Sequence, residues 1–534
     1  MTRRDPSDKA PGPGATTEDV PEPAGADSTG VPAPTMSLRL PAVVGLLAAG
    51  LLLTYAVVIV TPYAVTDDYF RLAQTLRGES FDLGNRAFKR SRSGEPTVGS
   101  SLARGCVTSA VMTVAAFELA GTIENLRWIR FFGVIGIALL GALLVRALTR
   151  AGWPLARSGA LAFLMCTTPS FQVCGSWAIL FSVFYACAAA GLACELSLRA
   201  LVPGVPRRRQ LRLFVVVGAL LLFAVTIYQV SLMYLLVFAA IHVFRPRPDA
   251  ARDERSMLGL AAVTAGGLGL GFVAYQIGLA LFGRWLPSQR THMVHDFGAK
   301  LQYALTGPWR DAFQLGVLRP TPYLAPALFV AIFSGLFLYF EGTLRERLKL
   351  LALAVLLVPL VYLPNLMTSE NWGAYRTQLA LDPLVVLYAF LAAHGYAKAL
   401  GARAQRMVPG VVAAATVLSG LMTVHNLALY YAEPQMAELR VVKNQLSRLK
   451  PEKIKKLHIA GANWTSALTG VRYDEFGLPS TAQWWSAPSM VYVLTAERLG
   501  HLPKFPILQA PNNLPFKPPA GEWLINLSAF EEYR

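Results

Sequence analysis

Residues 38–60 read LRLPAVVGLLAAGLLLTYAVVIV and are followed, at residues 66–71, by TDDYFR. The first segment is apolar over the length of one membrane-spanning helix, which needs about 20 residues. It is the first of about eleven apolar stretches in the chain. The chain has 534 residues, of which 54% are hydrophobic and only 15% are charged. Because long apolar runs dominate this composition, we expect a polytopic α-helical membrane protein.

Asp67 and Asp68 follow the first apolar stretch directly, so they are expected at a membrane surface. Carboxylates near hydrocarbon are costly, and they usually mark a transport pathway, a cation site or a catalytic base. A structural alternative is that the pair caps a helix over residues 69–76, because aspartate suits a helix N-terminus. One aspartate would be enough for capping, which favours the functional interpretation.

The net charge of +17 could indicate a nucleic-acid partner. However, Lys and Arg occur in short clusters between apolar runs and not along one polar face, so no nucleic acid is expected. Such clusters indicate topology, because positively charged loops stay in the cytoplasm. Five clusters are assigned there, at residues 146–157, 199–212, 245–255, 345–349 and 398–406. The five cysteines lie in apolar segments without metal-ligand spacing, and we expect them to be packing residues.

Three regions are expected along the chain. Residues 1–36 are rich in Pro, Gly, Ala and acidic residues, which predicts a disordered cytoplasmic tail. The first apolar run starts near Leu38, which is late for a cleaved signal peptide. Residues 37–431 are expected to form the transmembrane domain, and residues 432–534 a small periplasmic α/β domain.

The membrane topology follows from the basic clusters, because two cytoplasmic clusters must be joined by an even number of crossings. Residues 155–173 and 176–198 then form a hairpin whose tip lies at residues 167–171. Residues 211–244 cross twice, with an outer tip at residues 226–229.

Residues 98–120 do not fit as a full crossing, because the cluster that begins at Arg146 would then lie outside. We interpret this stretch as a re-entrant or interfacial helix on the outer face, and a conventional span is the alternative because Arg104 and the small residues around it also fit one. The resulting map has about 11 crossings, with the N-terminus inside and the C-terminal domain outside.

The C-terminal region is predicted to contain strands at residues 455–461, 490–494 and 523–527, separated by loops rich in Pro, Gly and Asn. Its tryptophans could stack on sugar rings or pack in a small core; they are Trp464, Trp484, Trp485 and Trp523.

A lipid-linked sugar phosphate would explain the polar residues that this map collects at the outer face. Transfer of its sugar needs a carboxylate that takes a proton from the acceptor hydroxyl and cations that hold the departing phosphate. Asp67 or Asp68 is the candidate base, and Asp68 is favoured because it adjoins Tyr69 and lies on the same helical face as Leu72. The candidate substrate-binding residues are Arg71, Tyr228, Gln229, Arg310, Tyr375 and Arg376. Each Arg could instead extend toward lipid headgroups, and the Gln229 amide could simply satisfy a broken helix.

No cofactor or resident metal is expected. His292, His295 and Asp296 have ligand-like spacing, but no further Cys or His joins them, which favours a surface loop. A divalent cation at Asp67 and Asp68 is possible but not favoured.

These residues together resemble the GT-C class of polytopic glycosyltransferases, and within it the bacterial O-antigen-modifying, or serotype-converting, glucosyltransferases. The resemblance rests on Asp67-Asp68-x-x-Arg71, the 227–229 segment, the Pro169 segment and Tyr375-Arg376, in this order along residues 39–430. It implies a polyprenyl-phosphate sugar donor, an inverting transfer on the periplasmic side of the inner membrane, and a catalytic aspartate at position 67 or 68. The implied acceptor is a cell-envelope glycan such as lipopolysaccharide O-antigen.

Two other functions stay open. A transporter or flippase for a lipid-linked envelope precursor would place charged or broken helices near the bilayer midplane and would show internal repeats. An O-antigen ligase or polymerase would favour paired Arg and His in large outer loops, as in the segment that contains His292, His295 and Arg310.

Overall fold

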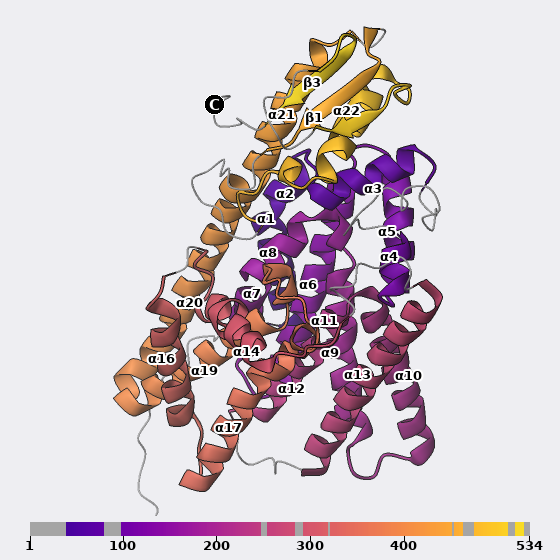
Figure 1. Cartoon of the computed structure of the whole chain (residues 1–534). Helices are drawn as coiled ribbons and strands as arrows, with labels where there is room; N and C mark the ends of the chain where they lie inside the picture. The colour runs from indigo at the N-terminus through magenta and orange to yellow at the C-terminus, as the bar shows by residue number, and fades with distance from the viewer. Residues whose placement is uncertain are drawn as a thin grey trace, which may run out of the picture. The chain divides into compact units, whose positions relative to one another are not determined.

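The computed structural model of the chain describes residues 39–79, 98–246, 254–282, 292–318, 321–450, 453–462, 475–510 and 518–527. These parts are mostly helical, with one small parallel sheet near the C-terminus (Figure 1). Within these ranges, six helices are long and apolar enough to cross a membrane, so the chain is a multi-pass membrane protein. They cover Leu126–Arg150, Ala178–Ala200, Arg207–Ile227, Gly259–Leu281, Leu381–Leu400 and Ala402–Ser447. The predicted tail, residues 1–36, lies outside the described residues.

The elements follow one another in three groups. The first contains α1 (Leu40–Thr54), α2 (Ala56–Val60), α3 (Thr66–Leu76), α4 (Val98–Ala103), α5 (Val107–Ala120), α6 (Leu126–Arg150), α7 (Leu155–Cys166), α8 (Pro169–Ser176), η1 (Ala178–Leu180) and α9 (Val183–Ala200). The second contains α10 (Arg207–Ile227), α11 (Gln229–Leu232), α12 (Tyr234–Val243), α13 (Glu254–Phe282), α14 (Phe297–Thr306), α15 (Pro308–Phe313), α16 (Leu324–Tyr339), α17 (Leu344–Val361) and α18 (Leu363–Met367).

The third group runs to the C-terminal sheet. It contains η4 (Tyr375–Thr377), α19 (Leu381–Leu400), α20 (Ala402–His425), the π-helix η5 (Asn426–Ala432), α21 (Glu433–Ser447), β1 (Lys456–Ala460), η7 (Ser480–Ala482), α22 (Ser486–Leu499), β2 (Ile507–Gln509) and β3 (Glu522–Asn526).

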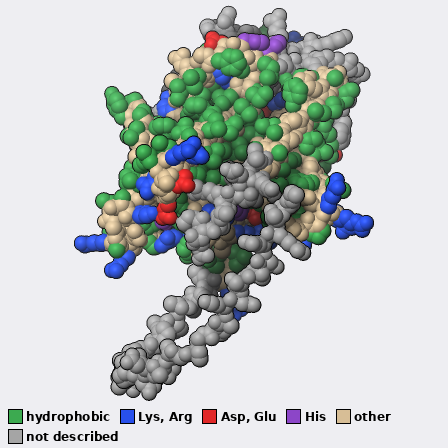
Figure 2. Space-filling view, turned by 90° about the horizontal axis from the view of Figure 1, so that it is seen from below, with side chains coloured by type: hydrophobic (Ala, Val, Ile, Leu, Met, Phe, Trp, Pro, Cys, Tyr) green, Lys and Arg blue, Asp and Glu red, His purple; other side chains and the backbone are tan. Residues whose placement is uncertain are grey.

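One end of the helical bundle collects residues of the basic clusters. Arg150 at the end of α6 pairs with Glu195 of α9 at 2.8 Å, and the same carboxylate bonds His242 of α12 at 2.5 Å. Lys398 near the end of α19 pairs with Glu341, which follows α16, at 2.5 Å. We call this end the basic end. Figure 2 shows the molecule from below, with more Lys and Arg than Asp and Glu side chains on that face.

The opposite end is fixed by a buried arginine. Arg130, near the start of α6, donates hydrogen bonds of 2.6 to 2.8 Å to the carbonyls of Val58, Thr61 and Tyr63. The end of α2 therefore meets the start of α6, as two antiparallel neighbours require. Because α3 and its Asp67-Asp68 pair follow directly, we call this the aspartate end.

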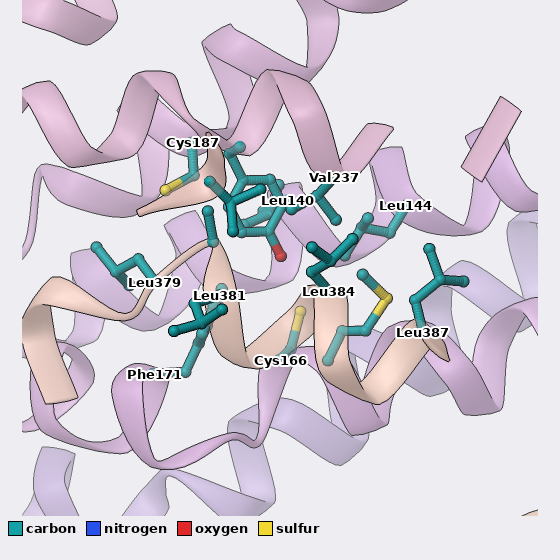
Figure 3. Packing of buried hydrophobic residues seen from close by; sticks show 14 of the residues in the cluster. Leu140, Leu144, Cys166, Phe171, Cys187, Val237, Leu379, Leu381, Leu384 and Leu387 are labelled. Atoms are coloured by element: carbon teal, nitrogen blue, oxygen red, sulfur yellow. The ribbon is translucent and has the colours of Figure 1, made fainter. Parts of the chain in front are cut away.

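The core of the bundle is built from side chains of several helices. Figure 3 shows Leu140 of α6, Cys166 of α7, Phe171 of α8, Cys187 of α9 and Leu384 of α19 packed together, and all five are buried. Every cysteine is buried and none forms a disulfide, which confirms the prediction that they are packing residues.

The predicted hairpin tip at residues 167–171 is wrong. These residues are buried, and Pro169 begins α8. Proline suits the first turn of a helix, so here it starts a second helix where a turn was expected. Cys166 lies against Gly141 of α6, and Phe181 lies against Gly133. The chain thus continues along α6 toward the aspartate end and reverses only between α8 and α9.

At residues 226–229, where an outer tip is predicted, the helix is broken. Helix α10 ends at Ile227, Tyr228 is extended with a φ of −160°, and α11 begins at Gln229. Residues 98–120 form the two helices α4 and α5. The Thr108 and Thr226 hydroxyls are 2.8 Å apart, and the Ile123 amide bonds Glu497 of α22 at 3.1 Å. Helix α5 therefore leads from the last turn of α10 toward the C-terminal region.

The C-terminal region is an α/β unit with the strand order β2-β1-β3, and both pairs of strands are parallel. Figure 1 shows the sheet beside α21 and α22. The predicted strands near residues 456 and 523 are confirmed as β1 and β3. The predicted strand at residues 490–494 is wrong, because this segment belongs to α22 and is buried. A short buried apolar run has no periodicity that separates a strand from a helix.

Candidate functional site

Asp68 is held in a buried position by the backbone of two separate segments. Its carboxylate accepts hydrogen bonds from the N–H groups of Val65 at 3.2 Å, Ala178 at 3.4 Å and Ile179 at 3.0 Å. The side chain has no exposed surface. Burial raises the pKa of Asp68 from 3.8 to about 7, while the charge of Arg130 and the N–H donors oppose that rise. Asp68 therefore connects the start of α3 to η1.

Asp67 has a different environment. It is half-buried, and its carboxylate accepts a hydrogen bond of 2.9 Å from the indole N–H of Trp485. Trp484 lies next to Trp485 in an edge-to-face contact, with the ring centroids 5.8 Å apart, and is 40% exposed. The accessible carboxylate of the pair is therefore that of Asp67, beside two tryptophans.

The C-terminal unit also forms hydrogen bonds with the start of α3. The Thr66 N–H donates to the Ser480 hydroxyl at 2.8 Å. The buried Glu438 carboxylate accepts from the N–H groups of Ser480 at 2.8 Å and Thr481 at 2.9 Å. The aspartate pair is thus fixed between the helical bundle and the loop before α22, and all of these contacts lie within one compact unit that begins at Arg39.

Arg71 and Arg104 bring positive charge to the surroundings of Asp67. Arg71 is 4% exposed and donates to the Gln74 side chain at 3.0 Å, but its Nε has no hydrogen-bond partner in the described part of the chain. Burial and the charge of Arg104 lower the pKa of Arg71 to about 10, partly offset by Asp67. Both guanidinium groups therefore lie close enough to act on one another, and Arg71 also interacts with Asp67.

Arg376 lies beside the segment that binds Asp68. Its guanidinium sits 4.8 Å from the ring centre of Trp177, the residue before η1, and pairs with Glu475 at 3.2 Å. The charges of Arg376 and Arg104 both act on the Tyr228 hydroxyl. The structure therefore brings Arg376 to the surroundings of the aspartate pair, whereas no contact in the described ranges joins Tyr228 to that pair.

Three predicted site residues have other surroundings. Gln229 donates to the carbonyl of Arg104 at 2.5 Å, so its amide holds the turn between α4 and α5. Tyr375 is 2% exposed and packs edge-on against Phe476. Arg310 bonds its neighbour Asp311 at 3.1 Å in α15, and no contact in the described ranges joins it to the aspartate pair.

Several polar atoms around the aspartate pair are buried without a partner among the described residues. They include the Nε of Arg71, the hydroxyl oxygen of Tyr69, the indole N–H of Trp177 and one carboxylate oxygen of Glu475. A buried polar group without a partner usually indicates a missing ligand, water or ion. The two nitrogen atoms, of Arg71 and Trp177, can only donate, which suits an anion.

No group of three or more His, Cys, Asp or Glu side chains within the described ranges is placed to hold a metal ion. His292 lies instead on a short antiparallel contact, where its carbonyl accepts from the Ser369 N–H at 2.8 Å. A magnesium ion at Asp67 would have to share its carboxylate with Trp485.

The sequence interpretation did not single out Arg104, Arg130, Trp177 and Glu475. Arg130 carried a signal, because an arginine at the start of an apolar span needs buried partners. Arg104, Trp177 and Glu475 carried none, because their roles depend on which distant segments meet.

No model of a known protein family matches the chain, and no curated protein matches it in sequence. The fold and site define a multi-pass helical membrane protein with an aspartate pair at one end, of which Asp68 is buried and Asp67 half-buried. What this site does therefore has to be inferred from its own residues.

Proposed function

We propose that the chain is an inverting membrane glycosyltransferase that moves a sugar from a polyprenyl-phosphate donor to a glycan or another acceptor of the bacterial cell envelope. The observation that carries this proposal is the placement of Asp67, which is half-buried, accepts a hydrogen bond from Trp485 and lies near the positive charge of Arg71. A carboxylate base beside phosphate-binding cations is the combination that such a transfer needs.

Asp67 acts as the general base in the proposed reaction. The acceptor hydroxyl oxygen attacks the anomeric carbon, its proton moves to the Asp67 carboxylate, and the bond between that carbon and the phosphate oxygen breaks. The electron pair of this bond stays on the departing polyprenyl phosphate. We favour Asp67 over Asp68, because the Asp68 oxygens already accept three backbone N–H groups and have no exposed surface.

Arg71, Arg104 and Arg376 stabilise the phosphate as it leaves. Guanidinium groups fit phosphate oxygens in a bidentate manner, and they gain strength where water is scarce. The unpartnered Nε of Arg71 and indole N–H of Trp177 supply two further donors. Trp484 offers an exposed ring next to Asp67 on which an acceptor sugar can stack.

An open apolar groove of about 480 Å³ suits the polyprenyl chain. It lies between α5, α6, α9 and α10 and is lined by Met112, Leu139, Phe181, Ala189 and Phe223, among others. Phe181 stands two residues after Ile179, whose N–H binds Asp68. A chain in the groove would therefore bring its phosphate to the aspartate pair.

The proposed topology has about 11 crossings, with the basic end in the cytoplasm and the aspartate end in the periplasm. The six long helices and the shorter apolar helices around them support it. Lys and Arg gathered at the basic end favour this orientation.

The test is sugar transfer in membranes that contain the protein and radiolabelled polyprenyl-phosphate glucose, galactose or mannose. Asp67→Asn should reduce turnover by on the order of 10² to 10⁴ while the protein still folds and inserts. Asp296→Asn is the matched control, because Asp296 is an exposed helix cap that asparagine replaces without loss. Full transfer by an Asp67→Asn/Asp68→Asn variant would remove the carboxylate mechanism and favour the flippase alternative.

A second variant tests the groove. Ala189→Phe fills it from α9 and should raise the donor KM several-fold, because the lipid chain then loses part of its binding surface. Ala414→Phe places the same ring on an exposed face of α20 and should leave transfer unchanged.

A further inference from the structure

Arginines from three helices meet at the basic end, and the proposed transfer reaction does not use them. Two are one turn apart near the end of α6, one is in the last turn of α9, and one is in the first turn of α10. They are Arg146, Arg150, Arg199 and Arg209, and all four are exposed. The charges of the other three all act on Arg199. We call these four residues the arginine cluster.

Side-chain contacts fix the ends of the three helices relative to one another. Arg150 of α6 pairs at 2.8 Å with Glu195, which lies one turn before Arg199 in α9. The Gln210 side chain donates to the Ala200 carbonyl at 3.1 Å, which places the start of α10 against the end of α9. The arginine cluster is therefore one surface of the folded bundle and not a set of separate loops.

The positive charge of the cluster exceeds the negative charge that faces it. Glu195 binds Arg150 with one carboxylate oxygen, and its other oxygen lies 2.5 Å from the His242 ring. Among the described residues, no other carboxylate forms an ion pair with a member of the cluster. Like charges one helical turn apart, such as Arg146 and Arg150, also repel one another. An anion bound here would relieve this repulsion.

The apolar groove between α5, α6, α9 and α10 ends at the cluster. On α6, Leu139 and Leu143 line the groove, and Arg146 continues the same face because residues three and four apart are neighbours on a helix. On α9, Leu192 lines the groove, and Arg199 stands two turns further along the same face. The arginines therefore lie where an apolar surface meets the end of the bundle.

Helix α10 adds further apolar surface beside the cluster. Leu211 and Val215 are each 65% exposed, although α10 is long and apolar enough to cross the membrane. Lipid chains therefore cover these side chains in the membrane. An anion that carries acyl chains can contact both the arginines and this apolar surface, whereas a soluble anion can contact the arginines alone.

We propose that the arginine cluster binds the headgroup of an anionic phospholipid, whose acyl chains lie against the apolar faces of α6, α9 and α10. Guanidinium groups fit phosphate oxygens in a bidentate manner, and basic pockets between membrane helices bind such headgroups. The bound lipid joins the ends of the three helices. This inference does not depend on the proposed transfer reaction, because the cluster lies at the end opposite to the aspartate pair.

The experiment measures thermal unfolding of the purified, delipidated full-length protein in detergent. The probes are phosphatidylglycerol, phosphatidylcholine and inorganic phosphate. A ligand that binds only the folded protein raises its Tm, and we expect phosphatidylglycerol to raise it by at least about 3 °C. Phosphatidylcholine and inorganic phosphate should have much smaller effects. An Arg146→Gln/Arg199→Gln variant, which keeps the Arg150–Glu195 pair, should lose at least about tenfold in affinity for phosphatidylglycerol.

Arg403→Gln/Arg406→Gln is the matched control, because it removes the same charge from two exposed arginines near the start of α20 and should leave the affinity unchanged. If the cluster variant does not fold, Arg209→Glu reverses the charge of an exposed residue of α10 and should weaken binding in its place. Equal stabilisation by inorganic phosphate and phosphatidylglycerol would overturn the assignment to a lipid. Equal affinity of the wild type and the cluster variants would overturn the proposal, as would no effect of any probe.

Discussion

Asp67 and Asp68 are neighbours in the sequence, yet their environments differ. The buried Asp68 connects two segments through hydrogen bonds, whereas Asp67 is half-buried and accessible. The difference arises because α3 starts between η1 and the loop before α22, and successive side chains of a helix point to different neighbours. Asp68 points to the N–H groups of η1, whereas Asp67 points to Trp485. This assignment separates stability from turnover at adjacent positions.

We expect Asp68→Asn to destabilise the protein by roughly 1–3 kcal/mol at pH 5, because one amide oxygen cannot serve the backbone donors that the carboxyl group serves. Asp67→Asn keeps an acceptor for Trp485, and its Tm should stay close to the wild-type value. Thermal unfolding of both variants in detergent checks this. Equal loss of Tm in the two variants would contradict the different environments.

The stability difference between wild type and Asp68→Asn should depend on pH. The pKa of Asp68 is about 7 in the folded protein and 3.8 is its ordinary value. Between these values the folded state holds a proton that the unfolded state has lost, so this group's contribution to stability is present at low pH and falls as the pH rises toward 7. The gap in Tm between the two proteins should therefore shrink from pH 5 to pH 7.5. If the difference in Tm widens instead, the pKa of Asp68 is lowered in the folded protein and not raised.

The sequence located the aspartate pair and Arg376, because charged residues stand out next to apolar spans. It could not show that Asp68 is occupied by backbone donors, since those donors belong to residues 178 and 179, more than one hundred positions away. The sequence interpretation also grouped Arg310 with the site. In the structure, Arg310 forms an ion pair with the neighbouring Asp311.

At the scale of elements, breaks in the helices were easier to predict than their geometry. The polar Tyr228-Gln229 pair in an apolar run indicated a break, and the chain is broken there. Pro169 indicated a break as well, but a proline at the first turn of a helix does not decide whether the chain reverses. The contacts of Cys166 and Phe181 with α6 decide it, and these depend on tertiary packing.

Small residues control how closely α16 and α19 pack. A Cβ atom at Gly395 would come within 2.1 Å of the Gly335 carbonyl oxygen. Gly395→Ala should therefore force the two helices apart and cost about 1–3 kcal/mol of stability. At Gly410 of α20 no atom lies within 4 Å of such a Cβ, so Gly410→Ala should be neutral or slightly stabilising. Thermal unfolding compares the Gly395→Ala and Gly410→Ala variants. Equal Tm values would show that α16 and α19 can separate without loss of stability.

For the whole molecule, composition and charge clustering were sufficient to predict a polytopic helical membrane protein. The parity of the basic clusters is consistent with the structure, because residues of separate clusters, among them Arg150 and Lys398, meet partners at one end. The C-terminal unit was less predictable. Its segment 490–494 is rich in β-branched and apolar residues, but full burial in α22 overrides that local preference.

The orientation of the whole molecule can be tested by cysteine labelling. The native cysteines are all buried, so they should react little with a membrane-impermeant maleimide. Leu400 at the basic end is 77% exposed, and Leu502 after α22 is 44% exposed. If the basic end is cytoplasmic, Leu502→Cys should be labelled in intact spheroplasts, and Leu400→Cys only after the membrane is permeabilised. The reverse pattern would place Asp67 in the cytoplasm, where the proposed periplasmic acceptor would not reach it.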